Sequence, residues 1–179
     1  MSNRACNKVR FLVDEMLGRL VRWLRILGFD AIWASDFRKN PSEDIDSEIL
    51  AFSLLNNRVL VTRDKQLAKK ADSCGLKVIL IPQNSDIVEN LVLIFKEMRI
   101  KLSSDRFFPA RCPVCNGTLQ LINKLEIKDR VPLNSWRAHN DFWICNKCGK
   151  VYWKGSHWKN IVNTLNRIKN LLEKSSQKD

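Results

Sequence analysis

Two Cys-x-x-Cys motifs in the second half of the chain constrain its fold most. The four cysteines are Cys112, Cys115, Cys145 and Cys148. A two-residue spacer lets both sulfurs of a motif face one ion, so the set suits tetrahedral Zn²⁺. Two disulfides are one alternative, and redox chemistry, which normally needs a single motif, is another. Four sulfurs leave no site for water or substrate, so we expect a structural zinc.

These motifs predict a zinc ribbon over residues 109–158. They are separated by 29 residues, 116–144, which exceeds the usual gap of about 15 to 20. We therefore expect an inserted hairpin or arm over 124–140. Gly117 and Gly149 follow the motifs and are expected to let the chain turn under the metal. Trp143 is expected in the small core of the ribbon, and an amphipathic helix is predicted over 159–174.

The first hundred residues alternate between short apolar runs and helical patterns. The runs predict strands at 10–13, 31–34, 58–62 and 77–81, and the patterns predict helices at 17–27, 45–55, 67–71 and 87–98. Such alternation favours right-handed βαβ units and a mostly parallel sheet covered by helices. The fold class is therefore predicted to be α/β, with a first domain over 9–104. A boundary is expected near Phe107–Arg111, where Pro109 interrupts the chain.

Acidic side chains stand where two predicted strands end. Asp14 follows the first strand and Asp64 the third, while Asp44 and Asp46 open a predicted helix. Ligands of parallel sheets bind at the carboxyl ends of strands, so these acids are expected in one crevice. Their mutual repulsion would be relieved by Mg²⁺ or Mn²⁺, which indicates phosphodiester hydrolysis. The alternatives are helix caps for Asp44 and Asp46 and an ion pair between Asp14 and Arg63.

The charge balance points to a polyanionic partner. Lys and Arg number 31 against 19 Asp and Glu, a net charge of +12, and residues 105–179 hold 14 basic and 6 acidic side chains. Nucleic acid is favoured over a membrane surface, and solubility is the alternative. The longest apolar runs, 78–81 and 91–95, fall far short of the about 20 residues of a membrane span. Residues 1–10 show no secretory signal, so we expect a cytoplasmic location.

Basic side chains in two regions are candidate RNA contacts. Arg19, Arg22 and Arg25 recur every three residues and are predicted to face away from the leucine stripe of their helix. Phosphate contact is favoured for Arg19 and Arg22, and for Arg25 a solvated face is an equal alternative. Arg63 is also placed to hold a phosphate. In the arm, Lys128 and Arg130 lie among aromatic residues, a combination that suits single-stranded RNA.

Several motifs resemble known nuclease families. Asp46–Ser53 followed by Val59–Asp64 resembles the PIN-domain nucleases. The resemblance is closer to the Mut-seven C-terminal RNase family, over about residues 9–160, and is carried by Phe11–Leu20, Arg22–Arg25, Thr62–Asp64, Cys112–Gly117 and Gly149–Trp158. It implies a PIN fold followed by a zinc ribbon, metal-dependent RNase activity, and metal-binding roles for Asp14, Asp46 and Asp64.

One position departs from that pattern. Many PIN nucleases carry a fourth acid two residues after the last motif Asp, and this chain has Gln66 there; Asp44 is a candidate replacement. The first hypothesis is an endoribonuclease whose basic ribbon holds single-stranded or structured RNA, such as tRNA or ribosomal RNA. The second is a non-catalytic RNA-binding or ribosome-associated protein, and a protein or ribosome partner is compatible with both. A pre-rRNA-processing nuclease fits the architecture but not these motifs.

Overall fold

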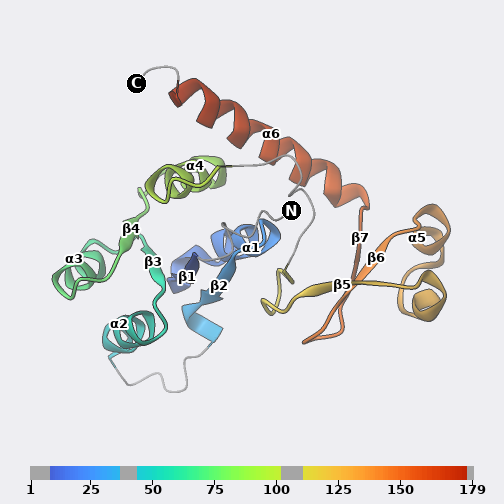
Figure 1. The fold of residues 1–179 in the computed structure, drawn as a ribbon, viewed down its shortest axis with the longest axis horizontal. Coiled ribbons are helices and arrows are strands. Elements are labelled where there is room, and N and C mark those ends of the chain that lie inside the picture. The colour runs from blue at the N-terminus through green and yellow to red at the C-terminus, as the bar shows by residue number, and fades with distance from the viewer. Residues whose placement is uncertain (1–8, 37–43, 102–110, 177–179) are drawn as a thin grey trace, which may run out of the picture.

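A four-stranded parallel sheet forms the centre of the first part of the chain. The computed structural model describes residues 9–36, 44–101 and 111–176 (Figure 1). The strands are β1 (Arg10–Val13), β2 (Asp30–Trp33), β3 (Val59–Thr62) and β4 (Val78–Leu80), in the order β2-β1-β3-β4. Val13 lies opposite Trp33 on one side and Val61 on the other. The predicted parallel sheet is confirmed.

Helices cover both faces of this sheet. A 3-10 turn, η2 (Glu15–Leu17), leads into α1 (Gly18–Ile26), and η3 (Ala34–Asp36) follows β2. The other helices are α2 (Ile45–Leu55), α3 (Lys65–Ser73) and α4 (Ile87–Glu97). Successive side chains of a strand point to opposite faces, so Phe11 and Val13 pack towards α1 and α4, while Leu12 packs towards α2 and α3. The two resulting cores confirm the predicted α/β class.

An antiparallel three-stranded sheet forms the ribbon. Its strands are β5 (Leu119–Ile122), β6 (Phe142–Cys145) and β7 (Val151–Trp153), with β6 in the middle. The insertion between β5 and β6 is an arm of two short helices, η5 (Lys124–Arg130) and α5 (Leu133–Ala138), and not a hairpin. Phe142 and Ile127 are fully buried there, whereas Trp143 is half-buried. The expectation that Trp143 fills the ribbon core is wrong, because the alternation of β6 turns its neighbour Phe142 inwards.

A long C-terminal helix joins the two parts of the molecule. α6 (Ser156–Ser176) begins three residues before the predicted range and ends two after it. It leaves the ribbon after β7 and packs on α4 (Figure 1). Leu165 and Ile168 are buried in the same core as β1 and α1. The predicted boundary at 107–111 falls almost entirely outside the described residues, and within them no helix is both long and apolar enough to cross a membrane.

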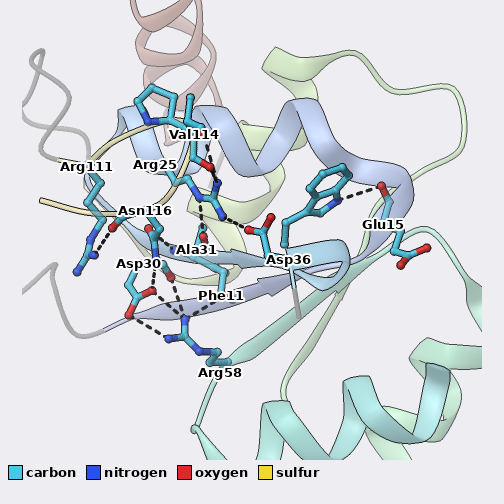
Figure 2. A network of polar contacts seen from close by, with 12 residues as sticks. Phe11, Glu15, Arg25, Asp30, Ala31, Asp36, Arg58, Arg111, Val114 and Asn116 are labelled. Atoms are coloured by element: carbon cyan, nitrogen blue, oxygen red, sulfur yellow. Dashed lines mark hydrogen bonds and ion pairs between the residues drawn. The ribbon is translucent and has the colours of Figure 1, made fainter. Parts of the chain in front are cut away.

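Polar contacts dock the first cysteine motif onto the edge strand β2 (Figure 2). Arg25 donates to the carbonyl oxygens of Ala31 at 2.8 Å and Val114 at 2.9 Å, and pairs with Asp36 at 2.8 Å. Asn116 accepts from the Ala31 amide at 3.3 Å. Arg25 is only 3% exposed, so its predicted outward orientation is wrong. Its guanidinium is buried because the first cysteine motif, remote in sequence, covers it and supplies acceptors in addition to Ala31 and Asp36.

Candidate functional site

The four motif cysteines meet at one point of the ribbon. Their sulfur atoms all lie within 4.8 Å of one another. The Cys112 and Cys148 sulfurs are 3.7 Å apart, and those of Cys115 and Cys145 are 3.4 Å apart. A tetrahedron with Zn–S bonds of about 2.3 Å requires separations of about 3.8 Å, whereas a disulfide requires about 2.05 Å. All four thiols are free, so the geometry fits a metal such as zinc and excludes the disulfide alternative.

Left-handed backbone positions shape the two cysteine turns. Asn116 has φ 64° and Gly149 has φ 69°, so the predicted role of Gly149 in the turn is supported. Gly117 acts differently, since a Cβ built on it would lie 2.7 Å from the Cys145 sulfur. That sulfur accepts from the backbone N–H groups of Lys147 and Cys148. Burial acts to raise the pKa of Cys145, but these N–H groups, together with hydrogen bonds from the Cys115 and Cys148 thiols, outweigh it and lower the pKa to about 7.

The predicted catalytic acids line one pocket at the carboxyl ends of β1 and β3. This acidic pocket has a volume of about 470 Å³ and is lined by Asp14, Glu15, Met16, Ile45, Asp46, Ile49, Asp64 and Leu67. Asp14 directly follows β1, Asp64 precedes α3, and Asp46 lies in the first turn of α2. Three separate elements therefore bring the three predicted aspartates to the same concavity, as the position of ligand sites in parallel sheets suggests.

Hydrogen bonds fix two of these aspartates. Asp14 is 8% exposed; its Oδ2 accepts from the Thr62 hydroxyl and its Oδ1 from the Glu15 amide, both at 2.6 Å. Asp64 caps α3 by accepting from the amides of Gln66 at 2.7 Å and Leu67 at 3.0 Å. The partner of Asp14 is thus a hydroxyl group and not Arg63.

Asp46 carries a cationic partner that the sequence pattern did not predict. The ammonium group of Lys70 in α3 lies 2.8 Å from Asp46 Oδ2, and this contact raises the pKa of Lys70. Asp44 does not line the pocket; it lies just before α2 and accepts from the Ser47 hydroxyl at 2.6 Å, which lowers its pKa. Lys70 is 24 positions from Asp46, so no local motif signals their contact.

The oxygen donors of the acidic pocket have the chemistry that Mg²⁺ and Mn²⁺ prefer. The carboxylate oxygens of the three aspartates are nevertheless not as close to one another as the four cysteine sulfurs are. Among the residues that the structure describes, the four cysteines form the close group of potential metal ligands, and the aspartates form no such group. Gln66 is exposed in the first turn of α3. Glu15, which is not among the predicted site residues, also lines the pocket. Its position directly after Asp14 is the feature of the sequence that could have indicated this.

The predicted RNA contacts fall on two surfaces. Arg19 and Arg63 line a second pocket next to the acidic one, and Arg22 is exposed on α1. Lys128 and Arg130 are exposed on the arm. The Lys128 ammonium lies 5.8 Å from the centre of the Trp136 ring, and Arg130 donates to the carbonyl of Gly149. Basic and aromatic groups are thus in contact on the arm, as expected for single-stranded RNA.

Comparison with known proteins agrees with the motifs. The searches of curated proteins and of solved structures found no significant match. A family model, described as the Mut7-C RNAse domain, matches residues 9–165. The matched range contains the whole acidic pocket, all four cysteines of the cluster and the first part of α6. The chain therefore belongs to the Mut7-C RNAse domain family.

Proposed function

We propose that this protein is a PIN-like endoribonuclease that hydrolyses RNA phosphodiester bonds at the acidic pocket. The observation that carries the proposal is that Asp14, Asp46 and Asp64, from three separate elements, line one pocket in a chain of an RNase-domain family. Carboxylates gathered at the carboxyl end of a parallel sheet supply the hard oxygen ligands and proton acceptors that this chemistry needs.

The chemistry of the proposed reaction follows from these oxygen donors. Asp14, Asp46 and Asp64 would hold Mg²⁺ or Mn²⁺, and the ion would supply an activated water and offset the charge that develops on the phosphoryl group. The water oxygen bonds to phosphorus, one P–O bond of the chain breaks, and the departing oxygen takes up a proton. A pocket carboxylate accepts the proton that the water loses. Thr62 and the Glu15 amide hold Asp14 in one orientation, which supports this role.

The ribbon is proposed to bind the RNA, and a zinc ion at the four cysteines is proposed to stabilise the fold of the ribbon. Lys124 and Lys128 lie over the Trp136 ring, with ammonium-to-centre distances of 4.8 and 5.8 Å. An unpaired base can stack on an aromatic ring while ammonium groups contact its phosphate. Arg19, Arg22 and Arg63 are proposed to contact the backbone nearer the acidic pocket. The four-thiolate shell has no open position, so the zinc acts in folding.

A second candidate function has its own support. Gln66 stands where many PIN nucleases have an acid, and Lys70 pairs with Asp46 in the acidic pocket. Both features suit a protein that binds RNA, for example on a ribosome or with a protein partner, without cleaving it. The Lys70–Asp46 ion pair is also compatible with the nuclease. Lys70 is 53% and Asp46 33% exposed, so a bound metal cation can take the place of the Lys70 ammonium at Asp46.

A cleavage assay separates the two functions. End-labelled RNAs of mixed sequence are incubated with the zinc-loaded protein and Mg²⁺, Mn²⁺ or no added metal, and the products are mapped. The endoribonuclease cuts internally only with added metal, and Asp64→Asn removes cutting while Asn retains the cap of α3. Asp72→Asn, an exposed acid elsewhere on α3, is the matched control and cuts normally. Tight binding without internal cuts by the unmutated protein contradicts the nuclease and supports the second function.

A further inference from the structure

A second pocket lies next to the acidic pocket. Its volume is about 480 Å³, and Arg19, Arg63, Asp86, Asn90 and Arg167 are among its lining residues. Met16 lines both this arginine pocket and the acidic pocket. A chain seated in one is therefore adjacent to the other.

The charge of the arginine pocket favours an anion. Three guanidinium groups and one carboxylate are its charged side chains, so its net charge is +2. The arginines come from α1, from the turn between β3 and α3, and from α6. Like charges brought together from three elements repel one another unless an anion lies between them. Arginine also offers several N–H groups in a planar fork that matches phosphate oxygens.

The hydrogen bonds of Arg63 are only partly satisfied. Its Nη2 donates to the Ser85 carbonyl at 3.1 Å, which anchors the side chain at the pocket, and its backbone carbonyl accepts from the Gln83 side chain at 3.1 Å. Its Nε is buried and has no partner among the described residues. An unpaired buried donor carries a free-energy cost. A bound anion or an ordered water at this side chain would remove that cost.

Arg167 is held weakly and is free to turn towards a ligand. Its contact with Asp86 is long, 3.5 Å, and the side chains are 65% and 52% exposed. Such exposed pairs contribute little stability. Asp86 is otherwise engaged, because it caps α4 by accepting from the amides of Val88 and Glu89 at 2.8 Å. Arg167 lies two residues beyond the family match.

We infer that the arginine pocket is a subsite for an RNA backbone phosphate, with Arg167 of the C-terminal helix as one of its ligands. The inference rests on the proposed function, because it takes the polyanion to be RNA. A phosphate held by Arg19, Arg63 and Arg167 places an adjoining nucleotide of the strand at the acidic pocket across Met16. α6 thus contributes directly to substrate binding in addition to its packing on α4.

The test is the affinity of the full-length, zinc-loaded protein for a fluorescein-labelled single-stranded oligouridylate, measured by anisotropy without added Mg²⁺ or Mn²⁺. Arg167→Gln is expected to weaken binding about tenfold, since a charge-assisted hydrogen bond is lost. The slope of log affinity against log salt is expected to fall by about 0.7, as one phosphate contact disappears. Lys169→Gln is the control; this exposed residue, two positions along α6, pairs with Glu173 and should bind as the unmutated protein does.

A second pair of variants, Asp86→Asn and its control Asp72→Asn, tests for an increase in RNA affinity. Asp86→Asn keeps the cap of α4, because Asn caps as well as Asp, and removes the carboxylate that competes with phosphate for Arg167. We expect tighter binding than with Asp72→Asn, which makes the same charge change on α3, away from the pocket. Thermal unfolding of all variants monitors the fold.

The outcomes distinguish this inference from the proposed function. If the unmutated protein cleaves RNA but Arg167→Gln binds like Lys169→Gln, the phosphate subsite is refuted and the nuclease stands. If Arg167→Gln weakens binding and nothing is cleaved, the subsite stands and the nuclease fails. Absence of RNA binding by the unmutated protein overturns both.

Discussion

At the residue scale, a glycine leaves room for the sulfur atoms of the four-cysteine cluster. A methyl group on Gly117 would meet the Cys145 sulfur at 2.7 Å and the Lys147 Cβ at 2.8 Å, distances that require the turn to open. Because zinc binding needs all four sulfurs around one ion, Gly117→Ala is expected to lower zinc affinity by at least about tenfold. Competition with a colorimetric chelator measures this.

Gly75→Ala is the matched control for that experiment. Gly75 has a positive φ, 70°, and a Cβ there meets nothing within 4 Å. The variant is expected to lose about 1 kcal/mol of folding free energy from backbone strain and to keep its zinc. Equal zinc affinities for the two variants would show that the space around Gly117 does not matter.

The carboxylate of Asp30 makes folding stability depend on pH. Burial acts to raise its pKa, but hydrogen bonds from Arg58 and Asn116, together with the positive charges of Arg58 and Arg111, outweigh burial and lower it. The folded protein therefore binds this proton less readily than the unfolded chain. The stabilisation is fully present above the unfolded pKa of about 4 and is lost as pH falls through the lower folded pKa.

Asp30→Asn tests this titration. Urea unfolding between pH 7 and pH 3 should show that the variant loses less stability below pH 4 than the unmutated protein does, because the variant has no proton to bind there. Parallel loss of stability in the two proteins would mean that Asp30 does not contribute to acid sensitivity.

At the element scale, local patterns predicted the α/β part well. Each predicted strand and helix there lies within two residues of the observed one, since apolar alternation and helical stripes are local properties. The arm was different. η5 and α5 are seven and six residues long, too short to show a repeating apolar stripe, so the sequence indicated an insertion and not its helices.

Arg25 shows the other limit of prediction from sequence. Its position on the polar side of the α1 pattern suggests solvent, yet Pro113 and Val114, which accept its hydrogen bonds, are 88 and 89 residues away. The location of the pocket aspartates was easier to predict from the sequence. A strand-end rule places Asp14 and Asp64 together from local sequence alone, whereas the Lys70 partner of Asp46 depends on how α2 and α3 pack.

Arg25 is expected to hold the ribbon on the sheet. Arg25→Met keeps the apolar stem but leaves the Ala31 and Val114 carbonyls without this donor, at an expected cost of about 2 to 3 kcal/mol in unfolding free energy. Urea denaturation measures it. Arg22→Met, an exposed arginine of the same helix, should change stability by less than about 0.5 kcal/mol; similar losses for both would contradict a docking role.

At the scale of the whole molecule, the C-terminal helix α6 packs back onto the first part of the chain. α6 leaves the ribbon and packs on α4 (Figure 1). Its Arg167 lines the same pocket as Arg63. The arginine pocket holds a net charge of +2, part of the +12 of the chain, while Asp14, Asp46 and Asp64 gather at the acidic pocket. Composition predicted a polyanionic partner; the arrangement of these surfaces depends on contacts between remote segments and was not predictable from local patterns.

The central claim is that the acidic pocket cleaves the RNA that the basic surfaces bind. Single-turnover cleavage with protein in excess over labelled RNA tests it most directly, because binding and chemistry are measured in one titration. For Asp14→Asn we predict a cleavage rate at least about 100-fold lower, with RNA affinity within about twofold of the unmutated protein. An unchanged rate, or no cleavage by the unmutated protein in Mg²⁺ and Mn²⁺, would contradict the claim.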